Sequence, residues 1–511
     1  MRWRHVGLAA LSGLFLALPF NDSSLFLLTW AGFVPLLVAM EHKTPAQSYR
    51  LGLICGLVLY GVGANWVVTF VEQLWSPPWP VTVLLSLLFW LYSAQLPALL
   101  MLAFQWLRQR IGWSDLLLFP LLATLFFAHF PMLFQAQLGE SQSDFLVALQ
   151  PLALTGVYGL DMLIALVNIL LLRWLHQSTA PWRDRVGLLA SLLPLAWMGY
   201  GVFELHHWEQ RMASWTPQRV GLVQTNTPAE SSGKPQPGHT LSQPRALALS
   251  RELVRDGARL VVWPETGFDA YFSRSRVASA LQQAAMEMNA ALLLQGMETV
   301  GTDQFNSAAL LASEGREAGR YRKIQRVAFG EYLPLLERFP QTGSRVREQL
   351  GGFFSRVSPG DAPARFASHG MELLPLICYE ALFPALVANA ARGGKAQELL
   401  VVLSNNAWFG ASQQPFQHLN ASVLRAVENR RPLLHVINNG PSAVILPTGQ
   451  RLLETRYGEE AAYWVDIPLP SRLGDSVFTR HPHGFIGLLY LLLLAALVSG
   501  FRATRPLALS R

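Results

Sequence analysis

Residues 80–107 read PVTVLLSLLFWLYSAQLPALLMLAFQWL, and this stretch decides the fold because it contains no Asp, Glu, Lys or Arg. A helix needs about 20 mostly apolar residues to cross the hydrocarbon core of a bilayer. Similar apolar runs predict further membrane helices at residues 6–20, 24–41, 50–71, 115–134, 147–175, 187–204 and 484–501. We therefore expect a membrane α-helical bundle of about eight transmembrane helices.

The first apolar run has an alternative interpretation as a signal peptide, because Arg2 and Arg4 precede a short apolar core. A signal peptide ends in small residues at its cleavage site. The corresponding residues here, Ala17-Leu18-Pro19-Phe20, do not fit that pattern. The sequence thus favours a membrane helix that is retained.

The composition agrees with a membrane protein. Of the 511 residues, 51% are hydrophobic and only 14% are charged. Soluble globular proteins average about 25% charged residues, and long disordered segments need low hydrophobicity. The composition therefore excludes both an ordinary soluble enzyme and a largely disordered chain.

Basic residues fall in alternate loops of the predicted bundle. One set of loops and the N-terminus carry Arg2, Arg4, Lys43, Arg50, Arg108, Arg110, Arg173, Arg183 and Arg185. The loops at 21–24, 72–80 and 135–145 contain no Lys or Arg. Because cytoplasmic loops carry the positive excess, we expect both termini in the cytoplasm. The long segment before the last helix then lies outside.

That outer segment, residues 216–483, has a different pattern and is predicted to be a separate domain. It follows a seven-helix membrane region at 1–215 and precedes the last membrane helix and tail at 484–511. Helical patterns occur at Arg276–Asn289 and Ala381–Arg392. Short apolar runs lie at Val220–Val223, Leu260–Trp263, Ala291–Leu294, Ala308–Leu311, Leu373–Ile377, Leu399–Leu403, Leu433–Ile437 and Ala443–Leu446. Runs too short for helices that alternate with amphipathic helices indicate an α/β domain with buried sheets.

The two cysteines differ in context. Cys55 lies in the third apolar run, where we expect it to serve packing. Cys378 is the lone thiol of the outer domain, so it is either a reactive thiol or a small buried hydrophobe. It follows a predicted strand and precedes the helical pattern from Ala381, and helix amides there would favour a thiolate.

A thiol nucleophile also needs a base and a donor for the oxyanion. Glu265 stands at the tip of a predicted strand, and Lys323 and Glu331 lie in a loop-like stretch. Taken singly these signals are weak, since Glu265 could cap a helix and Lys323 could be a solvated surface charge.

Taken together, the motifs resemble those of a known family. Their order is that of the Glu-Lys-Cys motifs in the nitrilase superfamily: Trp263-Pro264-Glu265, Lys323 ahead of Phe329-Gly330-Glu331-Tyr332, and Cys378-Tyr379-Glu380, followed by Ser404–Gly410 and Asn438-Asn439-Gly440. With membrane helices on both sides of this domain, the whole chain resembles the apolipoprotein N-acyltransferases of Gram-negative bacteria.

The resemblance implies a nitrilase-like αββα sandwich on the periplasmic side of the bacterial inner membrane. It implies transfer of a fatty acyl chain from a phospholipid to the N-terminal amino group of the diacylglyceryl-cysteine of apolipoproteins. The transfer would pass through a cysteine thioester and follow ping-pong kinetics. We expect no cofactor, no nucleic-acid partner, membrane lipid around the bundle, and a monomer.

The resemblance also assigns residue roles. Cys378 is the expected nucleophile, Glu265 the general base, and Lys323 the stabiliser of the oxyanion together with a backbone amide near Tyr379. Supporting roles fall to Glu331, Tyr379 and Glu380, although plain hydrogen-bonded loop acids are an equal interpretation for the two glutamates. Trp408 and Phe409 are expected to line the substrate pocket, with packing of a turn as the alternative.

The chain departs from the family pattern in three places. Asn406 stands where the family usually has Asp, and Ala328 where it has Pro. The tryptophan expected after Val223–Pro228 is missing. Two segments, Leu350–Phe354 and Leu382–Leu386, are candidates for lipid contact, with core packing as the alternative for the second.

Two other functions compete with acyl transfer. A membrane-tethered amidase of the nitrilase type would pass its thioester to water. A transporter would need ionisable residues inside the membrane, and Asp161 is the main one here. The histidine pairs at His206-His207 and His481–His483 lack the Cys or acid neighbours of a metal site, so we expect no metal.

Overall fold

The computed structural model describes residues 3–176, 184–228, 235–265, 270–333, 337, 339, 357–394, 397–471 and 474–503, and the chain divides into two compact units. Unit 1 comprises Met1–Val68, Pro78–Leu205 and His481–Arg511. Unit 2 comprises Thr69–Pro77 and His206–Arg480.

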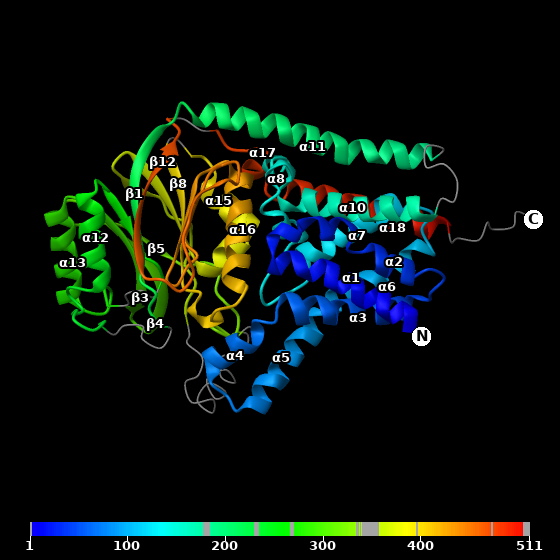
Figure 1. Ribbon diagram of the computed structural model, residues 1–511, viewed down its shortest axis with the longest axis horizontal. Coiled ribbons are helices and arrows are strands. Elements are labelled where there is room, and N and C mark those ends of the chain that lie inside the picture. Colours follow the sequence, from blue (N-terminus) through cyan, green and yellow to red (C-terminus); the bar gives the residue numbers. More distant parts are fainter. Residues whose placement is uncertain are drawn as a thin grey trace, which may run out of the picture. The chain divides into compact units, whose positions relative to one another are not determined.

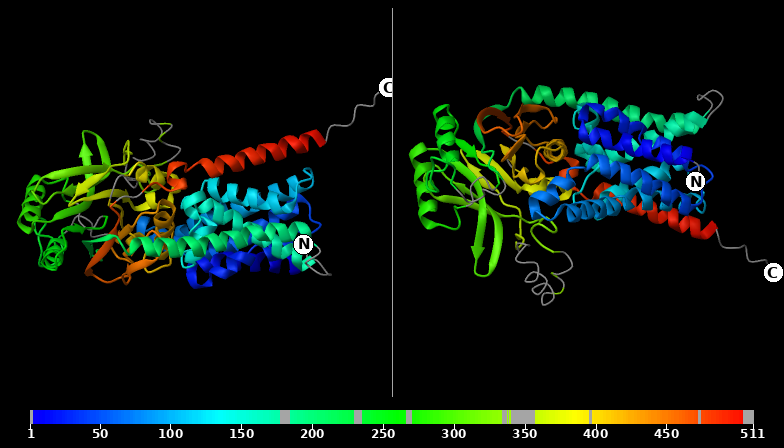
Figure 2. Two further views of the ribbon diagram at one scale, coloured as in Figure 1. Left: turned by 90° about the horizontal axis from the view of Figure 1, so that it is seen from above. Right: turned by 60° about the horizontal axis from the view of Figure 1, so that its bottom comes forward.

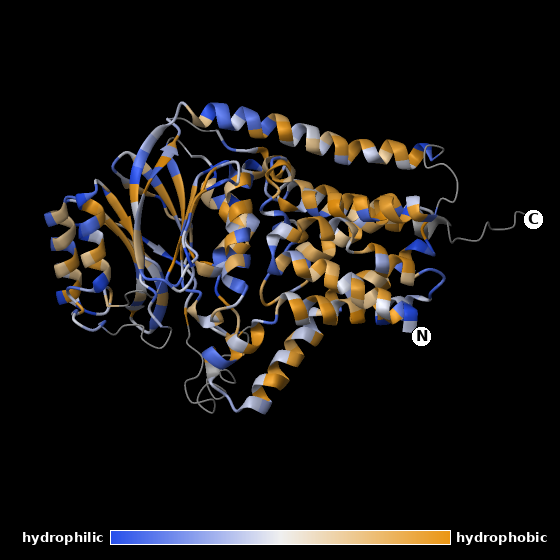
Figure 3. Cartoon of the chain, viewed as in Figure 1, coloured by the Kyte–Doolittle hydropathy of each residue, from blue (hydrophilic) through white to orange (hydrophobic). Residues whose placement is uncertain are grey.

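Unit 1 is built from apolar helices, coloured orange along much of their length in Figure 3. These are α1 (Trp3–Asn21), η1 (Ser23–Ala31), α2 (Val34–Ala39), α3 (Pro45–Gly63), α5 (Trp79–Ser93), α6 (Gln95–Arg108), α7 (Asp115–His129), η2 (Leu138–Gln142), α8 (Leu146–Leu149), α9 (Leu152–Thr155), α10 (Val157–His176), α11 (Arg185–Met212) and α18 (Gly484–Ala503). The C-terminal end of α11 continues into unit 2.

Four helical stretches among the described residues are long and apolar enough to cross a membrane. They are α1, the α5–α6 pair at Trp79–Arg108, α10 and α11. A fifth is possible if α3 and the following helix α4 (Val67–Trp75), bent by 60° between them, form one broken span. Membrane helices are therefore present, while the expected number of about eight stays a prediction.

The apolar run at 24–41 is not one regular helix, because a buried side chain replaces part of its hydrogen bonding. It forms the 3₁₀ helix η1 and then α2. Asn168 of α10 accepts a hydrogen bond from the Phe33 amide (2.8 Å) and donates one to the Thr29 carbonyl (3.1 Å). Backbone groups in an apolar surrounding must be satisfied within the protein, and Asn168 does this where the helix breaks.

Two glycines one turn apart allow α3 and α6 to approach closely. A Cβ atom on Gly52 would lie 2.6 Å from the Pro97 carbonyl oxygen, and one on Gly56 would lie 2.7 Å from the Ala94 Cα atom. Small residues at such spacing are typical of tightly packed membrane helices. Cys55 lies between them and is fully buried, in agreement with a packing role.

Asp161 has a local contact inside unit 1. Its Oδ1 atom accepts a hydrogen bond from the Gly139 amide at 2.7 Å, which attaches η2 to α10. This contact gives the buried carboxylate a structural role and does not require a transport pathway.

Unit 2 contains two six-stranded sheets. The first sheet comprises β1 (Thr216–Gln224), β2 (Leu260–Val262), β3 (Ala291–Val300), β4 (Asp303–Leu311), β5 (Glu317–Arg322) and β12 (Ala461–Leu469), in the order β12-β1-β2-β3-β4-β5. The second comprises β6 (Phe366–Ser368), β7 (Met371–Ile377), β8 (Glu398–Ser404), β9 (Leu433–Ile437), β10 (Ala443–Ile445) and β11 (Arg451–Glu454), in the order β11-β10-β9-β8-β7-β6. The neighbours β1-β2-β3 and β7-β8-β9 are parallel.

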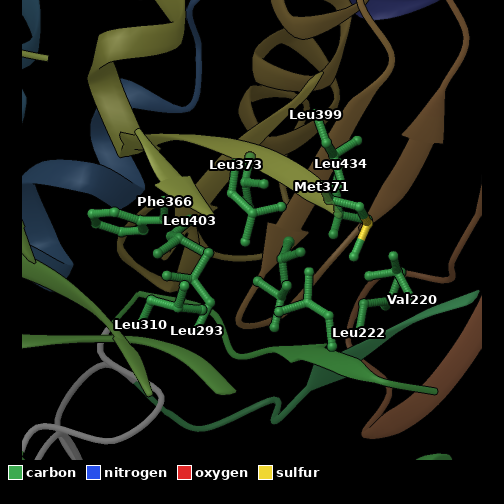
Figure 4. Close-up of a cluster of buried hydrophobic side chains, with 14 of the residues drawn as sticks. Val220, Leu222, Leu293, Leu310, Phe366, Met371, Leu373, Leu399, Leu403 and Leu434 are labelled. Atoms are coloured by element: carbon green, nitrogen blue, oxygen red, sulfur yellow. The ribbon is translucent and has the colours of Figure 1, made fainter. Parts of the chain in front are cut away.

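The two sheets face each other, and helices cover their outer faces (Figures 1 and 2). The helices are α12 (Arg245–Arg255) and α13 (Ser275–Met288) on the first sheet, and α15 (Pro384–Ala391), α16 (Gln414–Asn429) and the short α17 (Val477–Arg480) on the side of the second. Figure 4 shows the apolar layer between the sheets, where Val220, Leu222, Leu293 and Leu310 meet Leu373, Leu399, Leu403 and Leu434. A second apolar layer joins the first sheet to α12 and α13. The predicted αββα sandwich is confirmed.

All eight predicted apolar runs form strands, and the four strands without a predicted run lie at the sheet edges. These edge strands, β5, β6, β11 and β12, are only partly buried. An edge strand faces solvent along one side and needs fewer apolar residues, which accounts for the short or polar strands β5, β6 and β11, whereas β12 begins with the apolar residues AAYWV.

The helix expected over Ala381–Arg392 is shorter than predicted. The residues after β7 first form the 3₁₀ helix η5 (Cys378–Leu382), and α15 begins at Pro384. Proline fits the first turn of a helix, where its missing N–H has no intrahelical partner. Cys378 is thus not at the start of an α-helix, and the predicted activation by helix amides is wrong.

Candidate active site

The polar residues of interest gather where parallel strands end. Cys378 follows β7 directly, Asn405 follows β8, and Glu265 lies three residues after β2. Lys323 follows β5, which runs in the same direction as β3 because both are antiparallel to β4. Ligand sites of α/β proteins form at the carboxyl ends of such strands, so the topology alone brings these side chains to one edge of the sandwich.

Glu265 is held by groups from both sheets. Its Oε1 atom accepts a hydrogen bond from the Asn306 side chain at 2.8 Å, and its Oε2 atom accepts one from the Asn405 amide at 3.1 Å. The Cys378 thiol also hydrogen-bonds to this carboxylate. Only 6% of Glu265 is exposed. The carboxylate is therefore fixed in orientation, with the thiol as one of its partners.

Lys323 forms an ion pair with Glu331, whose Oε1 atom lies 2.9 Å from the ammonium nitrogen. The Lys323 side chain is 1% exposed. Glu331 is held in turn by the Val327 amide (2.8 Å) and by the same Asn306 side chain (3.2 Å). Asn306 thus connects both carboxylates, and Gln295 fixes its orientation by donating to Oδ1 at 2.7 Å.

Cys378 occupies an unusual backbone conformation, with φ at +54°. A non-glycine residue rarely adopts such an angle, and it persists only where the surroundings impose it. Its carbonyl oxygen lies 3.1 Å from Nε2 of His418 in α16. Cys378 is partly exposed as a residue, whereas the residues on either side are buried.

Glu380 supplies part of that restraint. Its carboxylate accepts hydrogen bonds from the amides of Ile377 (2.7 Å), Ile324 (2.7 Å) and Gln325 (3.0 Å). The Tyr321 hydroxyl donates to both of its oxygens, at 2.7 and 2.8 Å. The fully buried Glu380 therefore joins the turn that carries Cys378 to the loop that follows Lys323.

The electrostatic state of the thiol differs from the sequence-based prediction. Burial, and then the negative charge of Glu265, raise the pKa of the Cys378 thiol to about 12, although Lys323 lowers it. Burial also raises the pKa of Glu265. Burial alone would lower the pKa of Lys323, but Glu331, Cys378 and Glu265 outweigh it and raise that pKa. These shifts do not support the predicted resting thiolate: burial and the charge of Glu265 favour a neutral thiol, while Lys323 stays an ammonium group.

The three aromatic candidates differ in burial. Tyr379 is buried and packs edge-to-face on Phe383, with ring centroids 4.9 Å apart. Phe409 of η6 (Ala407–Phe409) is also buried and stacks on Phe70 of α4 at 5.1 Å. Trp408 is only partly buried. Packing thus accounts for much of Phe409, while Trp408 keeps surface that can contact a substrate.

Two of the three departures from the family pattern lie in the described residues. Asn406 is fully buried beneath the site. Ala328 pairs with Tyr332 in an isolated bridge. After β1, Asn438 holds Thr225 and the Thr227 amide, at 2.6 and 2.9 Å. The residues where the tryptophan was expected begin at 229 and lie outside the described residues.

The two candidate lipid-contacting segments have different outcomes. Leu350–Phe354 lies outside the described residues. In the second segment, Leu382 is buried and Leu386 is partly exposed, so core packing accounts for at least its first residue. Over the described ranges, no group of three His, Cys, Asp or Glu residues could hold a metal ion.

No sequence pattern pointed to Asn306, Gln295 or His418, and Ser404 was named only as the first residue of the Ser404–Gly410 motif. Asn306 and Gln295 are buried although they lie in the polar halves of β4 and β3, beside other polar residues, so their sequence context does not reveal their burial. Ser404 and His418 are also buried, but one ends an apolar strand and the other lies in an amphipathic helix. Their role depends on the packing of α16 against η5 and β9, which no local pattern shows.

A thiol, a carboxylate and an ammonium group at the strand ends of a two-sheet sandwich define a carbon–nitrogen hydrolase type of domain. Residues 219–472 match the family model described as Carbon-nitrogen hydrolase. Residues 12–170 match the model described as the Apolipoprotein N-acyltransferase N-terminal domain.

Similar proteins extend this match over the whole chain. A protein named apolipoprotein N-acyltransferase from Geobacter metallireducens is 32% identical over 93% of this chain and 91% of its own length. One of the same name from Chlorobaculum tepidum is 28% identical over 96% of each chain. The chain belongs to the apolipoprotein N-acyltransferase family, and it is an acyltransferase.

Solved structures match about half of this chain. An amidase of the nitrilase superfamily from Nesterenkonia is 21% identical, covers 53% of this chain and 97% of its own, and has a TM-score of 0.39.

Proposed function

We propose that Cys378 carries the acyl group between a phospholipid and the N-terminal amine of a diacylated apolipoprotein, with Glu265 as base and Lys323 as oxyanion donor. The observation that supports this assignment best is the hydrogen bond between the Cys378 thiol and the Glu265 carboxylate, beside a buried ammonium group. A nucleophile in contact with its base, and a positive charge alongside, are what acyl transfer through a thioester requires.

In the first half-reaction, Glu265 takes the thiol proton as the sulfur attacks the ester carbonyl of the phospholipid. The proton then passes to the departing oxygen, so that a lysophospholipid with a free hydroxyl leaves and an acyl thioester remains. Because the pKa of the thiol is raised to about 12 by burial and the nearby carboxylate, proton removal and attack must be coupled. This is general-base catalysis of nucleophilic attack.

Lys323 is well suited to the charge that develops on the carbonyl oxygen. An ammonium group has three N–H donors, and one of them is used by Glu331. The others are available to a tetrahedral intermediate, with a backbone amide near Tyr379 as the second donor. Because Lys323 is buried, its attraction for the oxyanion is weakly screened by water.

In the second half-reaction, the amine of the apolipoprotein attacks the thioester. Glu265 removes a proton from the amine, and the departing sulfur is protonated as the amide leaves. The site returns to a neutral thiol, which is its resting form. The two half-reactions share one base and one oxyanion donor, and the enzyme is expected to show ping-pong kinetics.

The membrane helices explain how a lipid serves as donor. Each methylene withdrawn from an apolar surrounding costs about 0.8 kcal/mol. A soluble enzyme would have to withdraw the whole acyl chain, whereas an enzyme anchored at the bilayer leaves most of it in place. We further propose a multi-pass inner-membrane protein with cytoplasmic termini and a periplasmic unit 2, which the basic loops support.

Intact mass spectrometry tests the thioester. The purified protein in phospholipid vesicles is expected to gain the mass of one acyl chain, and hydroxylamine should remove it. Addition of a diacylated lipopeptide with a free N-terminus should transfer the chain to an amide. Cys378→Ala is expected to show neither product, while Cys55→Ala, the matched cysteine control, should show both.

The same experiment distinguishes acyl transfer from the amidase-like alternative. A hydrolase would release free fatty acid and leave the lipopeptide unchanged. An acyl adduct on a residue other than Cys378 would overturn the assignment of the nucleophile.

A further inference from the structure

Three buried polar residues, His418, Asn406 and Ser404, form a chain beneath the nucleophile. His418 Nε2 lies 3.1 Å from the Cys378 carbonyl oxygen, and its Nδ1 lies 3.3 Å from the terminal oxygen of Asn406. The same amide oxygen lies 3.2 Å from the Ser404 hydroxyl. That hydroxyl also hydrogen-bonds to the Cys378 sulfur and lowers the pKa of the thiol. The chain therefore reaches both the backbone and the sulfur of Cys378.

The protonation of His418 follows from its surroundings. Nε2 must carry hydrogen, because a carbonyl oxygen can only accept. Burial and the charge of Lys323 lower the pKa of His418 to about 4. The ring is therefore neutral at neutral pH, with a single N–H, and Nδ1 must be an acceptor.

This assignment decides the orientation of the Asn406 amide. As placed, its oxygen faces the acceptor Nδ1, and its nitrogen is buried without a hydrogen-bond partner. The two ends of an amide are alike in shape and are distinguished by their hydrogen bonds. With the amide turned, its two N–H groups reach His418 Nδ1 and the Ser404 oxygen. The Ser404 hydrogen, of which there is only one, is then free for the sulfur.

We propose that Asn406 and His418 are positioning residues for the nucleophile: His418 restrains the Cys378 backbone, and Asn406 turns the Ser404 hydroxyl toward the sulfur. The restraint matters because Cys378 is held at a φ of +54°. The inference rests on the proposed role of Cys378 as nucleophile. It adds a donor to the thiolate as it forms, from the second sheet.

The link between Asn406 and Ser404 can be tested without turnover, by the rate of iodoacetamide alkylation of Cys378 in a Cys55→Ala background. Asn406→Asp replaces the N–H donor by an acceptor, so that the Ser404 hydroxyl turns to the carboxylate and leaves the sulfur. We expect alkylation near neutral pH to slow by about fivefold, the equivalent of one hydrogen bond.

The effect should disappear when Ser404 is absent. In a Ser404→Ala background, Asn406→Asp is expected to change the alkylation rate by less than about twofold, because the two residues act as one unit. Equal slowing in both backgrounds, or no slowing in either, would overturn the link. The acid introduced at position 406 lies next to His418. The groups around that ring are Cys378, Lys323 and His435.

The restraint by His418 is tested by two substitutions. His418→Gln keeps an N–H donor for the Cys378 carbonyl, and kcat should stay within about threefold of the native value. His418→Leu removes the donor, and kcat should fall by more than about 30-fold with KM almost unchanged. If glutamine is as harmful as leucine, or if both are harmless, the restraint is disproved. If the leucine variant does not fold, the Asn406–Ser404 comparison still decides.

His435 provides the matched control. Its ring packs on His418 with centroids 5.0 Å apart, but its hydrogen bond goes to Ser422. His435→Gln should leave alkylation unchanged, and slowing equal to that of His418→Leu would show that packing alone is responsible. Alkylation needs no acyl donor. If alkylation follows the predicted pattern but phospholipid gives no thioester, the proposed function is refuted and this inference stands.

Discussion

The two sheets contribute opposite kinds of chemistry to one site. The side of the first sheet carries the charges, with Glu265, Lys323 and Glu331 joined through Asn306. The side of the second sheet carries the sulfur of Cys378 and the neutral imidazole of His418, while the acid of that side, Glu380, is held by backbone amides and Tyr321. The charged groups are fixed by one another and by the backbone, so they are in place before any substrate arrives.

This difference shows how the site can be reactive toward a bound substrate and unreactive at rest. Preorganised charges lower the barrier because they need not rearrange during the reaction. A thiol held neutral is a poor nucleophile until its base acts. The first sheet thus supplies the charged groups that would lower the barrier, and the second sheet holds the sulfur on which they would act. The following predictions test the charged side of the first sheet and then the contact that joins the two sheets.

Removal of the ammonium group should have the largest effect. Lys323→Met takes away the charge that faces the oxyanion, and we expect kcat to fall by about 10²–10³-fold. The pKa of the thiol should rise further, because Lys323 lowers it in the native protein. Lys323→Arg keeps the charge in a larger group and should be impaired but less so. Native turnover of the Met variant in the lipopeptide assay would remove Lys323 from the mechanism.

Loss of the link between the two carboxylates should have the next largest effect. Asn306→Leu leaves Glu265 and Glu331 without their shared donor, and we expect kcat to fall by about 10- to 100-fold. Gln304→Leu, on the same strand but exposed, serves as the control and should be near native. A similar loss in both variants would assign the effect to the strand and not to the link.

The pH dependence of kcat/KM should report the first sheet alone. Burial raises the pKa of Glu265 above its ordinary value of 4.5, so activity should rise with pH through a midpoint above that value as the base loses its proton. The pKa of Lys323 lies above its ordinary 10.5, so the ammonium group should persist and activity should not fall before about pH 10. An acid midpoint at or below 4.5 would argue against Glu265 as the base.

The smallest effect is expected where the sheets are joined and no chemistry takes place. Tyr321→Phe removes a hydroxyl that donates to both oxygens of buried Glu380. The free energy of unfolding should fall by about 2 kcal/mol, as for other hydrogen bonds to charged groups. Thermal denaturation measures the loss, and kcat should stay within about threefold. A large fall in kcat with unchanged stability would place Tyr321 in the reaction.

The sequence predicted the inner part of unit 2 and the order of its motifs, because buried parallel strands leave apolar runs. It did not predict the edge strand β12, which reads AAYWVDIPL, is mostly apolar and is only partly buried. Glu265, Lys323 and Cys378 could be singled out only as a set in fixed order. Asn306 could not, because its importance comes from two carboxylates that are distant in the chain and meet at its side chain.

The charge state of Cys378 could not be predicted from the sequence either. A turn after a strand suggested helix amides and a thiolate, but the local turn is η5 and not an α-helix. Burial and a nearby carboxylate then outweigh the single lysine. Such a balance depends on how many charges reach one atom in the folded state, which spacing along the chain does not give.

Glu380 has a consequence for the order in which the enzyme becomes active. Its donors come from Ile324, Gln325 and Tyr321 at the end of the first sheet and from Ile377 at the end of the second. A chain with only one sheet formed holds a sulfur without its base, or a base without its sulfur. Under the proposed mechanism, a newly made chain is therefore expected to attack surrounding lipids only after both sheets have formed.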